Sequence, residues 1–422
     1  MIPLTTLRER PEEVVERLRV KHYDAQEQVS EILACDKRKR ECQKQLDENY
    51  AEQNRIAKSI GMLFKEGRKE EAEASKQRTA ELKEAAKKIE ADLTEWDEKI
   101  NQILVLLPNM PHISVPEGRS AEDNAEEYRW GDFEKKGACL PHWEICSRKN
   151  LIDFETGCKL TGAGFPLYRE KAAKLQRALI NFLLDQASQA GYSEVQVPYV
   201  VNSDSAYATG QLPDKEGQMY FVGEDRLYLI PTAEVPITNI YRNCLLKASD
   251  LPIRHCAYSA CFRREAGSYG KDVRGLNRLH QFDKVEIVQI VEPEQSYEVL
   301  ESMKAHVGGL IQKLGLPYRM IRLCGGDISF TSALTFDFEV YAKGQEKWLE
   351  VSSVSNFEDF QANRMKLRYK NQDGKTRLLH TLNGSALALP RIMAAILEDC
   401  QTDGQDIIVP EVLRPYTGFD RI

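Results

Sequence analysis

The segment that most restricts how this chain can fold lies near its N-terminus and is almost free of helix-breaking residues. Between Pro11 and Pro108 there is no proline, and the only glycines are Gly61 and Gly67. Because proline and glycine are the strongest local signals for the end of a helix, the segment predicts a long helix that is interrupted once.

Apolar residues downstream of the interruption alternate spacings of four and three residues, the heptad pattern of a helix that packs against another helix. The positions that follow this pattern are Leu82, Ala86, Ile89, Leu93, Trp96, Ile100, Ile103 and Leu107. Upstream, the same rhythm continues with polar insertions at Cys35, Lys39, Cys42, Leu46, Asn49, Gln53, Ile56, Ile60 and Leu63. Two such seams joined by a turn at residues 61–69 predict an antiparallel helical hairpin, whose arms of roughly 35 residues would each extend on the order of 50 Å.

The hairpin alone leaves two functions open. A coiled coil is often only a dimerisation element or a spacer, and charges on it are usually a solvated face. The other interpretation is an arm that reaches a distant partner and meets phosphates with its basic residues Lys37, Arg38, Lys39, Arg40, Lys44, Arg55 and Lys58. The formal net charge of −7 excludes an extended nucleic-acid-binding surface of the histone kind but leaves local basic patches open.

A chain of 422 residues is too long for one small core, and we expect two unequal domains. The sequence LLPNMPHISVPEG at 106–118 marks the end of the hairpin, which predicts a helical domain at 1–110 and a larger domain at 111–422. In the larger domain we expect strands at 194–201, 227–230, 282–291 and 336–342, and helices at 167–190, 294–314 and 387–400. The fold class is therefore α+β, with an antiparallel β-sheet flanked by helices.

The cysteines and the apolar segments indicate the compartment. Ten cysteines are scattered without a CxxC pair, so no zinc site is expected, and so many thiols suit a reducing cytosol. The N-terminus is charged almost at once, and no run of about 18 apolar residues occurs. We expect a soluble, cytoplasmic protein without a membrane partner.

Residues 261–286, CFRREAGSYGKDVRGLNRLHQFDKVE, combine two strand-like runs with a basic, glycine-rich loop. Arg263 and Glu265 are spaced to lie on the same side of a strand, and a guanidinium fork suits a phosphoryl oxygen. The loop adds cations that are placed to follow developing charge or to hold an RNA end: Lys271, Arg274 and Arg278. A surface hairpin is the simpler alternative.

Other polar groups follow apolar runs. Thr232-Ala233-Glu234 follows a predicted strand, and Glu234 with Glu286 would suit a substrate ammonium, unless both belong to unrelated surface salt bridges. Glu350-Val351-Ser352-Ser353 places a carboxylate and a hydroxyl within reach of one Mg²⁺ ion that bridges phosphates, although serines after a strand are more often turn residues.

The segment Leu382-Asn383-Gly384-Ser385 precedes an apolar helix that carries Arg391. It supplies an amide, a hydroxyl and one more cation, and an ordinary helix cap with a surface arginine is the alternative. No GxxxxGK[ST] sequence occurs, which excludes a P-loop mechanism.

In this order, these blocks resemble the three signature motifs of class II aminoacyl-tRNA synthetases of the seryl type, in the bacterial form. GYSEVQVPYVV, with Pro198, is similar to the dimer-forming first motif. FRREAGSYGKDVRG to HQFDKVE is similar to the second motif, and LNGSALALPR to the third. TAE and EVSS fit the serine family in particular, and with the hairpin the resemblance spans essentially the whole chain.

The resemblance implies an antiparallel catalytic sheet of six to seven strands and an N-terminal arm that grips the long variable arm of tRNA(Ser). It implies a homodimeric serine–tRNA ligase that activates L-serine with ATP and Mg²⁺, then transfers serine to the 3′ end of tRNA(Ser) and, by family analogy, of tRNA(Sec). Phe282 would stack on adenine, Arg391 would clamp the terminal phosphates, and Glu350 with Ser353 would bind the metal.

The resemblance also assigns whole sets of residues. Serine would be bound by Thr232, Ala233, Glu234, Glu286, Asn383 and Ser385. ATP would be bound by Arg263, Arg264, Glu265, Leu279, Phe282, Glu350, Val351, Ser352, Ser353 and Arg391. Catalysis would rest on Arg263, Glu350 and Arg391.

Some positions depart from the commonest family pattern, namely Val273, Asn277, residues 330–335 and Pro390. Pro390 stands where a glycine usually precedes the third-motif arginine, and its missing N–H is expected to shift the start of the helix. Two alternatives remain. A paralogue that loads a carrier protein is expected to lack the long arm, and an inactive homologue is expected to have lost Arg263, Glu286 or Arg391.

Overall fold

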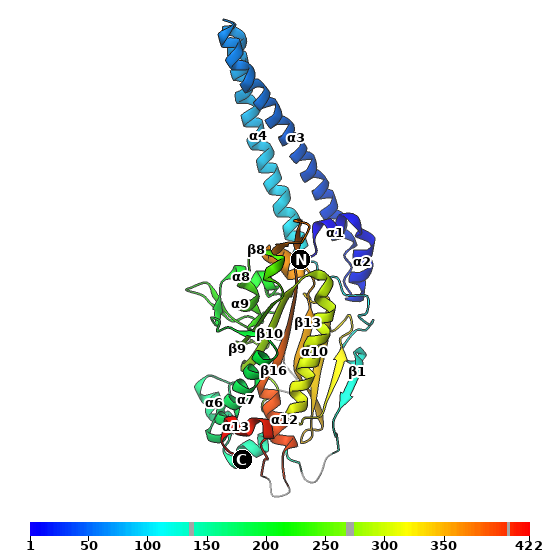
Figure 1. The fold of residues 1–422 in the computed structure, drawn as a ribbon, viewed down its shortest axis with the longest axis vertical. Coiled ribbons are helices and arrows are strands. Elements are labelled where there is room, and N and C mark those ends of the chain that lie inside the picture. Colours follow the sequence, from blue (N-terminus) through cyan, green and yellow to red (C-terminus); the bar gives the residue numbers. More distant parts are fainter. Residues whose placement is uncertain (135–138, 267–273, 403–405) are drawn as a thin grey trace. The chain divides into compact units, whose positions relative to one another are not determined.

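The computed structural model describes residues 1–134, 139–266, 274–402 and 406–422. The chain divides into two compact units, which can be followed in Figure 1 by the colours that mark residue number. The first unit consists of Met1–Arg19 and Tyr23–Pro108, and the second of Val20–His22 and Asn109–Ile422.

All the regular secondary-structure elements of the first unit are helices. Two short helices, α1 (Leu4–Glu9) and α2 (Pro11–Val20), precede α3 (Gln26–Lys65) and α4 (Lys69–Leu104). In Figure 1, α3 and α4 lie side by side as an antiparallel hairpin, and Lys99 of α4 forms a 3.0 Å ion pair with Glu31 of α3. Every predicted seam position is buried or half-buried, which confirms the coiled coil. The turn is shorter than predicted, because Gly61 lies inside α3 and only Gly67 has a positive φ.

The second unit is built on one sheet of eight strands in the order β1-β11-β12-β13-β16-β10-β9-β4. Neighbouring strands are antiparallel except for β4 and β9. The strands are β1 (Ala125–Trp130), β4 (Ser193–Glu194), β9 (Ile253–Phe262), β10 (Gln281–Val291), β11 (Tyr318–Arg322), β12 (Leu334–Ala342), β13 (Lys347–Asn356) and β16 (His380–Ala388). The predicted α+β class is confirmed, with short β1 and β4 edges extending the expected sheet.

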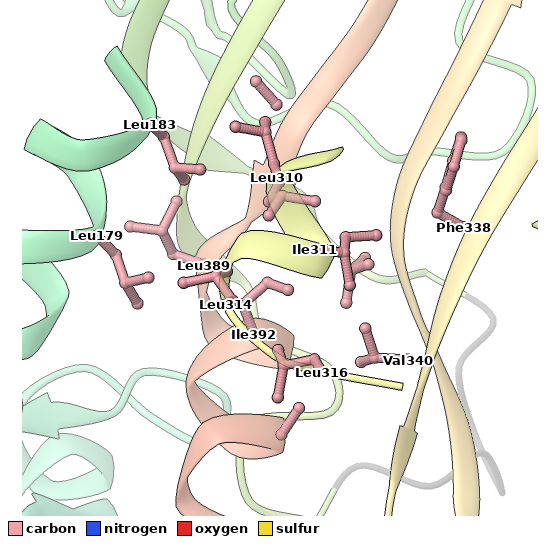
Figure 2. Packing of buried hydrophobic residues seen from close by; sticks show 14 of the residues in the cluster. Leu179, Leu183, Leu310, Ile311, Leu314, Leu316, Phe338, Val340, Leu389 and Ile392 are labelled. Atoms are coloured by element: carbon pink, nitrogen blue, oxygen red, sulfur yellow. The ribbon is translucent and has the colours of Figure 1, made fainter. Parts of the chain in front are cut away.

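Three helices cover one face of this sheet: α7 (Glu170–Gln189), α10 (Ser296–Lys313) and α12 (Leu389–Asp399) (Figure 1). Figure 2 shows their apolar side chains packed together, with Leu179 and Leu183 from α7, Leu310 from α10 and Ile392 from α12. Because the helices occupy this face, the polar side chains of the central strands gather on the other face.

Smaller elements complete the unit. The helices are α5 (His142–Lys149), α6 (Phe154–Leu160), α8 (Ser203–Thr209), α9 (Glu234–Asn239), α11 (Phe360–Met365) and α13 (Arg414–Thr417). The small sheets contain β2 (Ile152–Asp153) with β3 (Leu167–Tyr168), then β5 (Val200–Val201) with β6 (Phe221–Val222) and β7 (Leu227–Leu229), then β8 (Leu245–Lys247) with β14 (Arg368–Lys370) and β15 (Thr376–Leu378).

Two predicted elements were wrong in detail. The strand expected at 194–201 is two separate strands, β4 and β5, in different sheets. The helix expected from residue 167 begins at Glu170, because Leu167 and Tyr168 form β3. In the described ranges, no helix is long and apolar enough to span a bilayer.

Candidate active site

The central strands bring the sequence-predicted polar residues together through their register. Glu286 of β10 lies opposite Ser385 of β16, and Val288 lies opposite Asn383. Residues opposite each other in an antiparallel ladder share a face, so Glu286, Ser385 and Asn383 line one surface of the sheet. All three are buried.

Glu286 is held by a lysine that lies two residues before it. Lys284 Nζ is 2.5 Å from Glu286 Oε2, and both side chains are almost completely buried. Thr232, three residues after the end of β7, accepts from Lys284 Nζ at 3.0 Å and donates to Glu286 Oε2 at 3.2 Å. The buried cation is therefore paired and hydrogen-bonded, which limits the cost of burying it.

Glu234 forms the second carboxylate of this pocket, at the start of α9. Its Oε1 accepts from Gln361 Nε2 of α11 at 2.6 Å, and Asn383 also hydrogen-bonds to it. Gln361 is itself fixed by Thr381, whose hydroxyl donates to Gln361 Oε1 at 2.7 Å. Three buried polar side chains, those of Gln361, Asn383 and Thr381, thus orient the Glu234 carboxylate within the pocket.

Burial dominates the electrostatics of both carboxyl groups. Burial, with a smaller contribution from the nearby charge of Glu286 and against hydrogen bonds from Gln361 and Asn383, raises the pKa of Glu234 to about 7. Burial also raises the pKa of Glu286, while Lys284 opposes the shift. Two carboxylates that face one small pocket make a site that favours a bound cation.

A second cluster of oxygen atoms lies on β12 and β13. A bulge follows the pairs Asp337–Ser353 and Phe338–Ser352, after which Glu339 pairs with Glu350. The extra residue is Val351, and it places Glu350 and Ser353 on the same face although they are three residues apart. Asp337, which the sequence analysis did not select, therefore joins the two predicted metal ligands.

Asp337 has the environment that is typical of a carboxylate that binds a cation. Its side chain is 8% exposed, and its Oδ1 has no hydrogen-bond partner among the described residues. Burial is the main cause that raises the pKa of Asp337, and the negative charge of Glu350 raises it as well. A hydrogen bond from Ser353 opposes this shift. An orphaned carboxylate oxygen beside Glu350 and Ser353 fits a hard divalent cation such as Mg²⁺.

Arg391 lies beside this cluster on α12. Its Nη1 donates to the Glu350 carbonyl at 2.6 Å, and its Nε donates to the Asn277 carbonyl at 3.0 Å. Pro390 occupies the first turn of α12, where its missing N–H leaves no helical hydrogen bond broken.

The second motif supplies the remaining cations. The guanidinium carbon of Arg263, just after β9, lies 5.2 Å from the centre of the Phe282 ring on β10, so the two groups predicted to bind ATP are adjacent. Glu265 is paired with Arg278, and the Arg264 N–H donates to the Gln218 carbonyl at 2.9 Å. Lys271 and Val273 lie outside the described residues.

Some predicted ATP and serine residues have buried side chains. Leu279 and Val351 belong to the main hydrophobic core, and Ala233 packs in a smaller apolar cluster. Ser352 donates its hydroxyl to the Ser385 carbonyl at 2.6 Å. At these positions a ligand would meet main-chain atoms or the shape of the pocket rather than a free polar side chain.

Sequence reasoning missed three residues of the site: Lys284, Asp337 and Gln361. A signal for Lys284 was present, since it lies two residues before Glu286 and so on the same strand face. Asp337 and Gln361 are recognisable only once the strands and α11 are in place, because their partners are distant in sequence.

The arrangement has two adjoining parts with different chemistry. One is a small buried pocket with carboxylates, an amide and hydroxyls, which suits a small ammonium compound with a polar side chain. The other is more open and combines arginines with a carboxylate and hydroxyl cluster, which suits a polyphosphate and its metal ion.

Comparison with known proteins decides between the families with such sites. Residues 1–111 match the seryl-tRNA synthetase N-terminal domain, and residues 221–400 match the tRNA synthetase class II core domain (G, H, P, S and T). A serine–tRNA ligase of Salinibacter ruber is 48% identical over 428 residues, covering 100% of this chain and 99% of the relative. The chain belongs to the seryl-tRNA synthetase family.

Further relatives agree with the seryl-tRNA synthetase assignment. A serine–tRNA ligase of Akkermansia muciniphila is 45% identical, covering 100% of this chain and 99% of the relative. The structure of a seryl-tRNA synthetase from Pyrococcus horikoshii complexed with ATP has a TM-score of 0.93 at 33% identity, covering 100% of this chain and 99% of that one. Family membership makes this chain an enzyme of the serine–tRNA ligase class and confirms the resemblance inferred from its motifs.

Proposed function

We propose that this chain activates L-serine with ATP to form seryl-adenylate and pyrophosphate, then transfers the seryl group to the 3′ end of tRNA(Ser). The observation that carries the proposal is the buried cluster of Glu234, Glu286, Lys284 and Thr232, which lies beside Ser385 and Asn383 on the same face of the sheet. This cluster has the charge to hold an ammonium and the polar groups to recognise a hydroxyl.

In the activation step, the serine carboxylate attacks the α-phosphorus of ATP in line and pyrophosphate leaves. Glu234 and Glu286 hold the serine ammonium, which aims the carboxylate away from them. Arg263 neutralises charge that develops on the α-phosphate, and Arg391 clamps the terminal phosphates. Phosphoryl-type transfer needs positioning and charge stabilisation more than a general base, and this site provides both.

Mg²⁺ fits the cluster of Glu350, Ser353 and Asp337, and when bound it would neutralise the phosphates and orient the leaving pyrophosphate. In the described part of the chain, no three His, Cys, Asp or Glu side chains form a ready-made metal group. That agrees with a Mg²⁺ site, since this ion usually takes one or two carboxylates and completes its shell with phosphates and water.

In the transfer step, a terminal ribose hydroxyl of the tRNA attacks the seryl carbonyl and AMP leaves. The pocket rejects alanine because an absent hydroxyl would leave buried polar groups unpaired. Threonine has to be excluded by the shape of the pocket.

The helical hairpin would bind the tRNA. On α3, Arg55 and Lys58 line a hollow together with Ala51, Asn54, Ser59 and Met62, which gives phosphates a basic docking place. We also propose tRNA(Sec) as a substrate, because one arm would grip both tRNAs. The enzyme would be a homodimer and would act in the cytoplasm, where tRNA is charged for translation.

The test is serine-dependent exchange of labelled pyrophosphate into ATP, followed by serylation of tRNA. Exchange should require serine, and alanine should not replace it. Glu286→Ala should reduce exchange by on the order of a hundredfold or more, because it leaves Lys284 as a buried charge without its partner. Glu301→Gln, which removes the charge of an exposed glutamate paired with Lys304 on α10, is the matched control and should leave exchange unchanged.

Two outcomes would contradict the proposal. One is normal serine KM and turnover in Glu286→Ala. The other is serine activation followed by loading of a carrier protein instead of tRNA, which would favour the paralogue alternative.

A further inference from the structure

A buried histidine–glutamate pair lies behind the phosphate end of the site. His142 of α5 and Glu398 of α12 have completely buried side chains, and His142 Nδ1 lies 2.7 Å from Glu398 Oε1. Neither residue belongs to the motifs that define the site. A buried carboxylate needs several donors, so its other partners show what the pair holds in place.

The hydrogen bonds fix the histidine as neutral in one tautomer. The N–H of Leu276 points at His142 Nε2 across 2.8 Å, so Nε2 accepts. The hydrogen atom of the ring is therefore on Nδ1, where it is donated to Glu398. Gly275, with φ of +66°, approaches so closely that a Cβ there would lie 2.1 Å from His142 Nε2. The pair thus clamps the end of the second-motif loop at residues 275–276.

Glu398 also binds the turn between β12 and β13. Gln345 donates to Glu398 from its main chain, at 3.1 Å to Oε2, and from its side chain, at 2.9 Å to Oε1. The Gln345 Oε1 in turn accepts from Asn277 Nδ2 at 2.8 Å. The Glu398 carboxylate therefore binds α5 and the β12–β13 turn directly, and these two hold the second-motif segment at 276–277.

The network returns to the site through Arg391. The Asn277 carbonyl accepts from Arg391 Nε at 3.0 Å. Arg391 and Glu398 are seven residues apart on α12, about two helical turns, so they lie on the same side of the helix. The contacts form a closed ring from Glu398 through His142, residues 276–277 and Arg391 back along α12.

We propose that His142 and Glu398 are positioning residues for Arg391. They hold the carbonyl of Asn277 where it orients the guanidinium before ATP binds. This inference rests on the proposed function, in which Arg391 clamps the terminal phosphates of ATP. The pair touches no reacting atom and acts through the second-motif backbone. Loss of the pair should raise the KM for ATP while leaving serine recognition at Lys284 and Glu286 intact.

The test compares His142→Ala with His380→Ala in serine-dependent exchange. His380 hydrogen-bonds to Ser296 at 2.8 Å at the opposite end of β16 from Ser385, so its variant is a matched loss of a histidine hydrogen bond. In His142→Ala the KM for ATP should rise about tenfold, the effect of losing a hydrogen bond to a charged group. The KM for serine should change by less than about twofold, and His380→Ala should change neither KM.

A double-mutant cycle with Arg391→Ala separates this inference from the function on which it rests. If Arg391→Ala leaves the KM for ATP unchanged, the proposed phosphate clamp is wrong. If Arg391→Ala raises it and His142→Ala adds nothing further in that background, the positioning role holds. Full additivity of the two effects, or an equal rise of both KM values in His142→Ala, overturns it.

Gln345→Ala provides a second variant if His142→Ala does not fold. It removes the side-chain link between Glu398 and Asn277 on a partly exposed turn but leaves the buried histidine–glutamate pair. It should raise the KM for ATP in the same direction by a smaller factor. An unchanged KM for ATP in this variant would also overturn the inference.

Discussion

Burial makes Glu234 respond to pH in the physiological range. Its pKa is raised to about 7 from the ordinary value of 4.5, mainly by desolvation. A raised pKa means that the folded state favours the protonated carboxyl. Its contribution to folding stability is therefore complete below about pH 4.5 and is lost as the pH rises through about 7. Serine binding has the opposite requirement, because only the ionised carboxylate attracts an ammonium.

The pH dependence of serine activation should show this group. We expect kcat/KM for serine to fall as the pH decreases below about 7, since that ratio reports ionisations of the free enzyme. The inflection should be absent in Glu234→Gln, which retains the shape and the contact with Gln361. Exchange assays between about pH 5.5 and 8.5 measure this. An identical inflection in both proteins would assign it to another group.

Residues were predictable from sequence where spacing along one strand carried the information. Glu286 and Arg263 were selected as members of one segment, and Lys284 could have been selected with them, because it lies two residues before Glu286 on the same strand. Gln361 was out of reach, because its contact with Glu234 spans 127 positions and depends on how α11 packs. The orphaned oxygen of Asp337 likewise appears only when β12 pairs with β13.

At the scale of elements, the β12–β13 bulge predicts a metal-dependent phenotype for Asp337. Asp337→Asn should raise the Mg²⁺ concentration needed for half-maximal exchange severalfold, because it removes one charge from the metal cluster. Without Mg²⁺ and ATP, the melting temperature should not fall, since the same change relieves repulsion from Glu350 and Glu339.

The measurements are a Mg²⁺ titration of exchange and thermal unfolding in a chelator. Asp373→Asn, in an exposed turn, serves as the control. An unchanged Mg²⁺ requirement in Asp337→Asn would remove Asp337 from the metal site.

Elements with a long repeating pattern were predicted better than short ones. The seams of α3 and α4 repeat over many turns, so the 3.5-residue period outweighs single exceptions such as Gly61. The run at 194–201 looks like one strand, yet it splits into β4 and β5 because its two ends pair with different sheets. Local propensity contains no information about the pairing partner, so neither this split nor the bulge at Val351 could be foreseen.

For the whole molecule, the first-motif region predicts self-association. Its sequence predicts an apolar interface from Val195, Val197 and Val200, but Val197 is buried within its own chain and so does not supply an interface. Val200 on β5 and Phe221 on β6 remain 38% and 53% exposed on one small sheet, and such apolar exposure is typical of an interaction site.

Sedimentation at working concentration should therefore give twice the chain mass. Val200→Asp with Phe221→Asp should shift the protein toward the monomer, because each would bury a charge in the interface. Leu160→Asp, at an exposed leucine of α6, should not. A wild-type protein that is strictly monomeric and fully active would disprove the interface.

The most direct test concerns the proposal that the first unit binds tRNA and the second unit activates serine. The seams bury their apolar residues inside the hairpin, so replacing residues 28–102 with a short linker should leave the second unit folded.

In this deletion variant, serine-dependent pyrophosphate exchange should stay within about twofold of the full chain, while serylation of tRNA(Ser) should collapse. Binding of tRNA by the full chain should also weaken steeply with salt, as expected for phosphate contacts. If the truncated protein activates serine and still charges tRNA with unchanged efficiency, the hairpin is only a spacer and does not bind the tRNA.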